Sequence, residues 1–236
     1  MRLDKLLSNL GVASRAGCRE LLKAGRVQVD GQTVRDGAAQ VSEKAAVLLD
    51  GTALDTRLAR HLMLFKPPGV LTAAEDGRQQ TVMDLLPGVY RSCGCMPVGR
   101  LDKDTTGLLV LTTDGELAHR LIAPGRHVDK VYEAVVDGVL DEGDAAAFAA
   151  GIPLKDFTAL PAKLEVLAEN RARVTVQEGK YHQVKRMFGA RGKPVLALHR
   201  ASFGPLQLDE TLCPGQFREL TGEETAALYA AAGMRI

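Results

Sequence analysis

One stretch in the middle of the chain carries the densest chemistry and sets the fold around it. It reads Gly99-Arg100-Leu101-Asp102-Lys103-Asp104-Thr105-Thr106-Gly107-Leu108-Leu109-Val110-Leu111-Thr112-Thr113-Asp114-Gly115. Asp102 and Asp104 stand between glycines and shortly before an apolar strand expected at 108–111. A rigid strand can hold such a loop at the edge of a sheet and direct a carboxylate into a cleft. Asp102 is therefore a candidate nucleophile or general base.

The residues of this stretch alone leave the aspartates open to other interpretations. Both are compatible with a purely structural role, because Asp is common in turns. The run Asp102-x-Asp104-x-Thr106 also approximates the DxDx(T/V) signature of haloacid-dehalogenase-type phosphotransferases. That signature follows a buried strand, whereas Pro97-Val98-Gly99-Arg100 precedes it here and the strand comes afterwards.

The segments around this stretch predict an α+β domain with a mostly antiparallel mixed sheet and flanking helices, because they follow no strict βαβ order. Apolar or alternating runs predict strands at 62–65, 108–111, 131–136, 164–167, 174–177 and 195–198. Helices are expected at 116–122, 144–150, 183–190 and 223–231, the last with a capping box at Thr221 and Glu224. The sequence contains neither a GxGxxG nor a P-loop motif, so no nucleotide cofactor is expected.

The first 26 residues form a basic segment in an otherwise balanced chain. The 236 residues contain 30 Lys and Arg against 29 Asp and Glu, for a formal net charge of +1. The segment holds two acidic residues and six basic ones: Arg2, Lys5, Arg15, Arg19, Lys23 and Arg26. A net charge near zero excludes a protein that holds polyanions by its total charge. The positive charge is nevertheless concentrated in the first 26 residues of the chain.

The same segment predicts two short helices and a β-hairpin. Leucines at helical spacing indicate one helix over 3–10, and Ser14 can cap a second that ends near 24. The stretch 26–34, with Asp30-Gly31 at its centre, is typical of a hairpin. On the second helix the basic residues lie four apart and share one face, where they can follow RNA phosphates or simply face solvent. Residues 51–60 lack periodicity and are expected to form a linker.

Composition narrows the remaining possibilities. Four cysteines are too few for a disulfide scaffold, and their spacing gives no zinc motif, so no metal is expected. No Trp and only 4% aromatic residues argue against a surface that stacks many bases. No signal-peptide pattern and no apolar run of membrane-spanning length occur, so a cytoplasmic location is expected.

Two resemblances connect these observations. Residues 1–50 resemble the S4 family of RNA-binding modules in the order of helix ends, basic positions and hairpin. Gly99–Asp102 followed by Thr105–Gly115 resembles the central motif of pseudouridine synthases, in the ribosomal branch that carries an S4 domain. Within that branch, residues 178–187 and the stretch 151–154 leading to 161–166 resemble the small-subunit (16S) members most of all. Supporting motifs follow in the family's order: Lys66-Pro67-Pro68-Gly69, Lys130-Val131-Tyr132, Glu178-Gly179-Lys180-Tyr181-His182-Gln183-Val184-Lys185-Arg186-Met187-Phe188 and Leu198-His199-Arg200.

The resemblance implies a role for each candidate residue. Asp102 is the catalytic carboxylate, Tyr132 lies against the target base, and Leu198 closes the pocket. Lys185 pairs with Asp102 where many relatives have Arg, and Arg100 contacts a phosphate or supports the loop. His182 receives no acid–base role. RNA contacts are expected from Arg2, Lys5, Arg15, Arg19, Lys23, Arg26, Lys66, Lys180, Gln183 and Arg186.

The expected reaction is the isomerisation of one uridine to pseudouridine. It breaks the C1′–N1 bond and joins C5 of the base to C1′, without loss of atoms or redox change, so no cofactor is expected. The expected organisation is an S4 domain at 1–58 and a catalytic domain at 59–236. The expected partner is 16S rRNA or a small-subunit assembly intermediate, bound by a monomer. A uridine of 23S rRNA, a non-catalytic RNA-binding role and a phosphatase are the alternatives.

Overall fold

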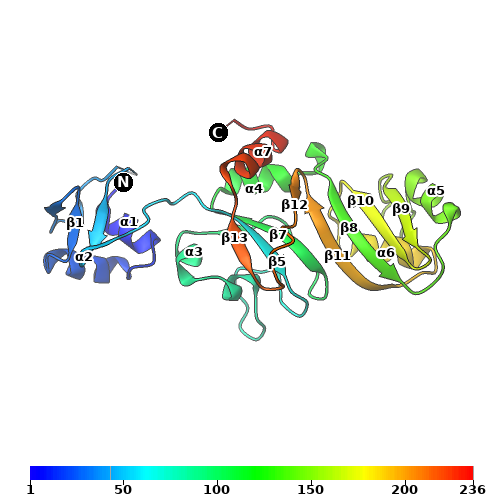
Figure 1. Ribbon diagram of the computed structural model, residues 1–236, viewed down its shortest axis with the longest axis horizontal. Coiled ribbons are helices and arrows are strands. Elements are labelled where there is room, and N and C mark those ends of the chain that lie inside the picture. The colour runs from blue at the N-terminus through cyan, green and yellow to red at the C-terminus, as the bar shows by residue number, and fades with distance from the viewer. Residues whose placement is uncertain (43, 236) are drawn as a thin grey trace. The chain divides into compact units, whose positions relative to one another are not determined.

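The computed structural model describes residues 1–42 and 44–235, which form two compact units (Figure 1). The first unit comprises Met1–Arg60 together with Leu86–Met96, and the second comprises His61–Leu85 and Pro97–Ile236. Each has its own cluster of buried apolar side chains, as expected of a unit that folds around its own core. In the described ranges no helix combines the length and apolar character needed to cross a membrane.

The first unit consists of helices beside a small antiparallel sheet in the order β2-β1-β3-β4. Its elements are α1 (Leu3–Asn9), α2 (Arg15–Lys23), β1 (Val27–Val29), β2 (Gln32–Thr33), β3 (Val47–Leu49), β4 (Thr52–Ala53) and α3 (Gly88–Ser92). Ser14 Oγ accepts the backbone N–H of Gly17, which confirms the predicted cap of α2. The predicted hairpin is also confirmed, with Asp30 and Gly31 at positive φ between β1 and β2.

Two features of this unit differ from the sequence prediction or were absent from it. The linker expected at 51–60 is wrong at its start, because β4 pairs with β3 across an Asp50-Gly51 turn of positive φ. That turn repeats the chemistry of Asp30-Gly31, and both match the left-handed conformation that tight hairpins require. The short helix α3 comes from the middle of the chain, and Cys93 just after it donates its Sγ–H to the carbonyl of Asn9, 3.2 Å away.

The second unit is built on one mixed sheet in the order β13-β5-β7-β11-β8-β10-β9. All neighbouring strands on this path are antiparallel except β7 and β11. The strands are β5 (His61–Lys66), β7 (Thr106–Thr112), β8 (Lys130–Val136), β9 (Lys163–Ala168), β10 (Arg171–Val176), β11 (Val195–Phe203), β12 (Leu206–Gln207) and β13 (Phe217–Glu219), with β6 (Met96–Pro97) at the unit boundary. This arrangement confirms the α+β class and the mostly antiparallel mixed sheet.

Helices cover the sheet in two places (Figure 1). They are η1 (Val82–Leu85), α4 (Gly115–Ile122), η2 (Pro124–Arg126), α5 (Glu142–Ala150), α6 (Gln183–Ala190) and α7 (Gly222–Ala231). Leu117 of α4 and Leu228 of α7 share a core cluster with Met63 and Val110 of the sheet. All the predicted helices and strands of this unit are present with small shifts of their ends. The predicted capping box of α7 is confirmed too.

The parallel contact between β7 and β11 decides where the aspartate loop lies. Gly107, at φ +106°, pairs with Arg200, and a Cβ built on it would lie 2.3 Å from the Arg200 carbonyl oxygen. Only glycine permits this approach. The loop that carries Asp102 and Asp104 therefore enters β7 pressed against β11, at one end of the sheet.

Candidate active site

A carboxylate and a lysine from distant parts of the chain meet at this end of the sheet. Asp102 lies on the loop before β7, and Lys185 lies near the start of α6. The Lys185 Nζ is 3.0 Å from Asp102 Oδ2 and 2.5 Å from Asp104 Oδ1. One ammonium therefore bridges both aspartates. The structure brings together the pair that the sequence motifs placed 83 positions apart.

The electrostatics of this bridge favour its charged form. The hydrogen bond from Lys185 is the main cause that lowers the pKa of Asp104. Burial opposes the charge of Lys185, but its hydrogen bonds to Asp104 and Asp102 raise the pKa of its ammonium above the ordinary value. The side chain of Asp102 is 25% exposed and that of Asp104 is 76% exposed. Asp102 thus faces a partly enclosed space, whereas Asp104 faces solvent.

His182 is a neighbour of Asp102 to which the sequence analysis gave no role. Its Nε2 lies 3.5 Å from Asp102 Oδ1. It occupies the position before α6 with φ +50°, a left-handed conformation that non-glycine residues adopt rarely. Its ring stacks on Tyr181 at 3.8 Å between centroids. No sequence pattern announces this backbone conformation.

A narrow cavity of about 60 Å³ lies next to Asp102. Tyr132 of β8 and Leu198 of β11 line it, and both are more than nine-tenths buried. The hydroxyl of Thr105 is buried in its wall and makes no hydrogen bond with any residue that the structure describes. Arg100, which is exposed, stands at its edge. Four of the residues that the motifs assigned to catalysis and its support therefore line one cavity, and the fifth, Lys185, contacts the cavity through Asp102.

Lys66 and Gln183 are not placed as expected. Lys66 is fully buried, and its Nζ donates to the carbonyls of Pro67, Lys103 and Thr105 at 3.0–3.1 Å. Burial lowers its pKa to about 8. Gln183 is buried as well, accepts the N–H of Lys180 and donates to a carboxylate oxygen of the preceding loop. Both side chains are enclosed and support loops beside the cavity, which Gln183 also lines, so contact with RNA stays a prediction for both residues.

The two other basic residues of this region remain accessible but carry partners. Lys180 forms a 3.1 Å ion pair with Glu178, and its ammonium lies 3.9 Å from the centre of the Phe157 ring. Arg186 pairs with Asp156, and its guanidinium lies 5.1 Å from the centre of the same ring. An RNA phosphate that binds here has to compete with these carboxylates.

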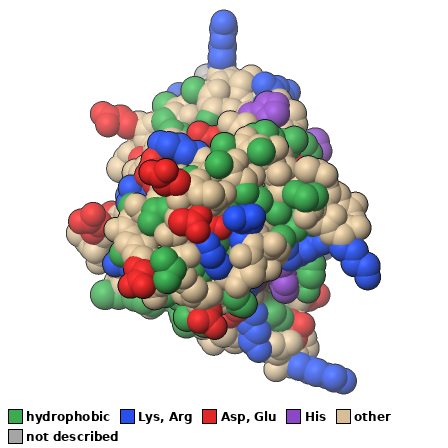
Figure 2. Space-filling model, turned by 90° about the vertical axis from the view of Figure 1, so that its right-hand side faces the viewer, with side chains coloured by type: hydrophobic (Ala, Val, Ile, Leu, Met, Phe, Trp, Pro, Cys, Tyr) green, Lys and Arg blue, Asp and Glu red, His purple; other side chains and the backbone are tan. Residues whose placement is uncertain are grey.

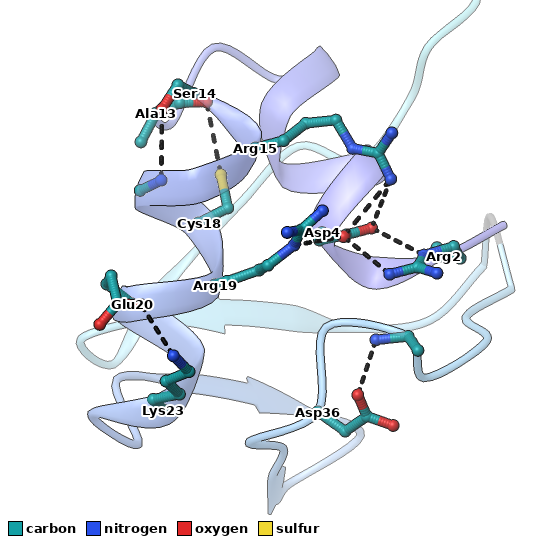
Figure 3. Close-up of polar contacts among 12 residues, drawn as sticks. Arg2, Asp4, Ala13, Ser14, Arg15, Cys18, Arg19, Glu20, Lys23 and Asp36 are labelled. Atoms are coloured by element: carbon teal, nitrogen blue, oxygen red, sulfur yellow. Dashed lines mark hydrogen bonds and ion pairs between the residues drawn. The ribbon is translucent and has the colours of Figure 1, made fainter.

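The basic residues of the first unit are organised around one buried carboxylate (Figure 3). Asp4 has no exposed side-chain surface, and nitrogen atoms of Arg2, Arg15 and Arg19 lie 3.0–3.3 Å from its oxygens. The hydrogen bond from Arg2 is the main cause that holds the pKa of Asp4 well below its usual range. The three arginines are each about half exposed, so their guanidinium groups are gathered into a cluster that still reaches solvent.

This cluster changes the predicted basic ridge. Lys23 does not continue the line of arginines but pairs with Glu20 at 2.9 Å. Arg26 pairs with Asp50, and Lys5 is exposed. The far end of the second unit, around α5, shows acidic, basic and hydrophobic side chains interspersed (Figure 2). The clustering of arginines in the first unit is therefore a local feature.

No group of three His, Cys, Asp or Glu side chains is placed to hold a metal ion within residues 1–42 and 44–235. The arginine cluster of the first unit and the carboxylate beside a cavity in the second fit the class of protein that the sequence motifs imply, an enzyme that modifies RNA.

Comparison with known proteins specifies this class. A family model described as RNA pseudouridylate synthase matches residues 60–190, and one described as S4 domain matches residues 1–47. An uncharacterized RNA pseudouridine synthase of Bacillus subtilis is 44% identical and covers 95% of this chain and 96% of its own. Ribosomal small subunit pseudouridine synthase A of Pseudomonas aeruginosa is 43% identical, and the match covers 97% of this chain and 100% of that protein. A crystal structure of a pseudouridylate synthase is 35% identical and has a TM-score of 0.68. This match covers 97% of this chain and 99% of that one.

The chain belongs to the RNA pseudouridylate synthase family and carries an S4 domain at its N-terminus. The family match spans Asp102 and Asp104 and argues against the phosphotransferase interpretation of this stretch. The phosphotransferase signature was an approximate match only.

Proposed function

We propose that this protein isomerises one uridine of small-subunit (16S) rRNA to pseudouridine, with Asp102 as the catalytic carboxylate. The observation that carries the proposal is the position of Asp102 at a cavity lined by Tyr132 and Leu198 and beside the Lys185 ammonium. The names of several relatives at 40–43% identity over nearly the whole chain favour small-subunit rRNA as the substrate. We propose a division into an RNA-binding domain at 1–58 and a catalytic domain at 59–236.

The geometry suits the first chemical step. A base that leaves its stack needs a flat apolar surface, and the ring of Tyr132, which lines the cavity, supplies one. Asp102 then faces the nucleotide as nucleophile or as base, while Lys185 keeps a positive charge beside it. Leu198 restricts water, which otherwise traps a sugar whose glycosidic bond is cleaved.

The arginine cluster around Asp4 suits the delivery of RNA. Arg2, Arg15 and Arg19 are held at fixed positions by a shared carboxylate, yet each keeps about half of its surface in solvent. Guanidinium groups arranged in this way can bind neighbouring backbone phosphates without first losing side-chain freedom.

The substitution Asp102→Asn tests the proposal, with Asp104→Asn as its matched control. Each substitution removes one carboxylate from the same loop, and each of these carboxylates contacts Lys185 through one oxygen. Of the two aspartates, Asp102 lines the cavity and Asp104 does not. Pseudouridine is to be mapped in rRNA from cells in which the gene for this protein is deleted, with and without a plasmid that expresses either variant. We expect Asp102→Asn to leave one 16S uridine unmodified and Asp104→Asn to restore it.

The outcome also separates the alternatives. If the missing modification lies in 23S rRNA, the proposed substrate is wrong while the chemistry stands. If no pseudouridine is lost, the protein is a binding protein. If Asp102→Asn modifies at the normal rate, the assignment of the carboxylate is wrong.

A further inference from the structure

A second cavity, of about 390 Å³, adjoins the candidate active site. The two cavities share part of their lining, including Tyr132, Arg100 and Glu178. The two cavities therefore adjoin one another, and Tyr132 lines both. Nothing in the reaction proposed above uses the larger space, although it has more than enough volume for an organic ring.

Two buried cations line this cavity and have donors to spare. Arg200 is 2% exposed; its Nε donates to the carbonyl of Leu108 at 2.7 Å, while its Nη2 is buried without a hydrogen-bond partner in the described part of the chain. Lys130 is 6% exposed, and its Nζ donates to the carbonyls of Val128 and Gln177. An ammonium has three donors, so one remains. Burial and the neighbouring Arg200 lower the pKa of Lys130 to about 8.

A buried donor without a partner destabilises the fold, so its presence at the wall of a cavity points to a ligand that supplies an acceptor. The Phe203 ring centre lies 5.2 Å from the Arg200 guanidinium and 5.7 Å from the Lys130 ammonium, and Val98 and Ile122 add apolar lining. The rest of the lining is partly polar and includes Arg100, Gln177, Glu178 and Lys180.

The aromatic and apolar part of this lining fits the face of a nucleobase, and the buried cations can donate to acceptors on the edge of such a base. Guanine suits two cationic donors in particular, because its O6 and N7 both accept hydrogen bonds.

We propose that this cavity holds the base of a second nucleotide, adjacent to the target uridine, with guanine preferred. The inference rests on the proposed function for the identity of the first base. Tyr132 then contacts two unstacked bases, one in each cavity. The enzyme gains sequence context from a neighbour of the target in addition to the uridine itself.

Binding of small nucleotides to the full chain tests this inference without any catalytic step. Affinities of UMP, UpU, UpG and GpU are to be measured by calorimetry. We expect the better of UpG and GpU to bind about tenfold more tightly than UMP, as one stacked and hydrogen-bonded base contributes. Two variants should remove that advantage: Arg200→Lys, which deletes Nη2, and Ile122→Trp, which fills the mouth of the cavity.

Ile122 is 48% exposed, so its variant keeps the fold even if Arg200→Lys does not. UMP affinity in Ile122→Trp should stay within about twofold of the wild type, because that residue lines only the second cavity. The inference is overturned if both guanine dinucleotides bind no better than UMP, or if their advantage survives in Ile122→Trp. It is also overturned if inorganic phosphate displaces UpG as well as GMP does, which would indicate an anion site. A dinucleotide advantage in a protein that modifies no uridine would refute the proposed function alone.

Discussion

Replacing Lys66 with Met removes the ammonium that holds the aspartate loop to β5. Its Nζ donates to three carbonyls, two of them, on Lys103 and Thr105, within the loop itself. Each carbonyl that loses a buried donor costs about 1.5 kcal/mol, or about 4–5 kcal/mol together. This loss is partly offset, because Met carries no charge and the variant therefore avoids the cost of burying the Lys66 ammonium. Burial lowers the pKa of Lys66 from 10.5 to about 8, a charge penalty of about 2 kcal/mol once solvent screening is allowed for. The net loss of unfolding free energy is then about 2–3 kcal/mol at neutral pH.

The cost of burying the charged form of Lys66 also determines how the stability difference between the two proteins depends on pH. Between pH 8 and pH 10.5 the folded chain has released the proton of Lys66, while the unfolded chain still binds it. Stability of the wild type therefore rises with pH across this window relative to the Met variant, which has no such group. The difference between the two proteins should widen to about 4–5 kcal/mol near the top of the window.

Urea unfolding of both proteins near neutral pH and at about pH 9.5 measures these differences. Lys103→Met is the matched control, since Lys103 lies on the same loop but is exposed and contacts only the side chain of Gln79. It should change stability by less than about 0.5 kcal/mol. The account of Lys66 fails if its Met variant is as stable as the control, or if the gap does not widen with pH.

Three further substitutions have expected outcomes. Asp4→Asn should weaken binding to substrate rRNA about fivefold while it strengthens binding to heparin, because the arginines lose their shared anchor and the chain gains positive charge; filter binding checks both. Gly107→Ala should destabilise the fold by about 2–4 kcal/mol in thermal unfolding, because its Cβ meets the Arg200 carbonyl, whereas Gly189→Ala, in open space, should not. Lys185→Met should lower kcat at least about a hundredfold with little change in KM, and an unchanged kcat would contradict the bridge to Asp102.

Local patterns in the sequence were enough to predict most of the fold. Leucine spacing and Ser14 located the first helices, and Asp30-Gly31 located a hairpin, because each signal acts over a few residues. Very short elements such as α3 and β13 were not predicted. They contain too few residues for a periodicity to develop, and tertiary contacts stabilise them.

The site was predictable in its residues but not in its contacts. Family motifs located Asp102 and Lys185, whereas burial of Lys66 depends on carbonyls up to 39 positions away. Asp4 carried a readable signal, since it shares a helical face with Leu7 of the buried leucine stripe. His182 had none, because a left-handed backbone at a non-glycine residue follows from its surroundings.

The presence of Lys185 where many relatives have arginine changes how firmly Asp102, the proposed catalytic carboxylate, is held. An arginine fork opposite Asp102 makes two parallel hydrogen bonds to one carboxylate and fixes it. The Lys185 ammonium instead divides its donors between Asp102 and Asp104, with the shorter contact to the exposed Asp104. Asp104 thus positions the lysine, and Asp102 keeps an oxygen less constrained by it. A carboxylate that must leave its ion pair to react with a nucleotide pays less to do so in this arrangement, while the positive charge stays in place beside it.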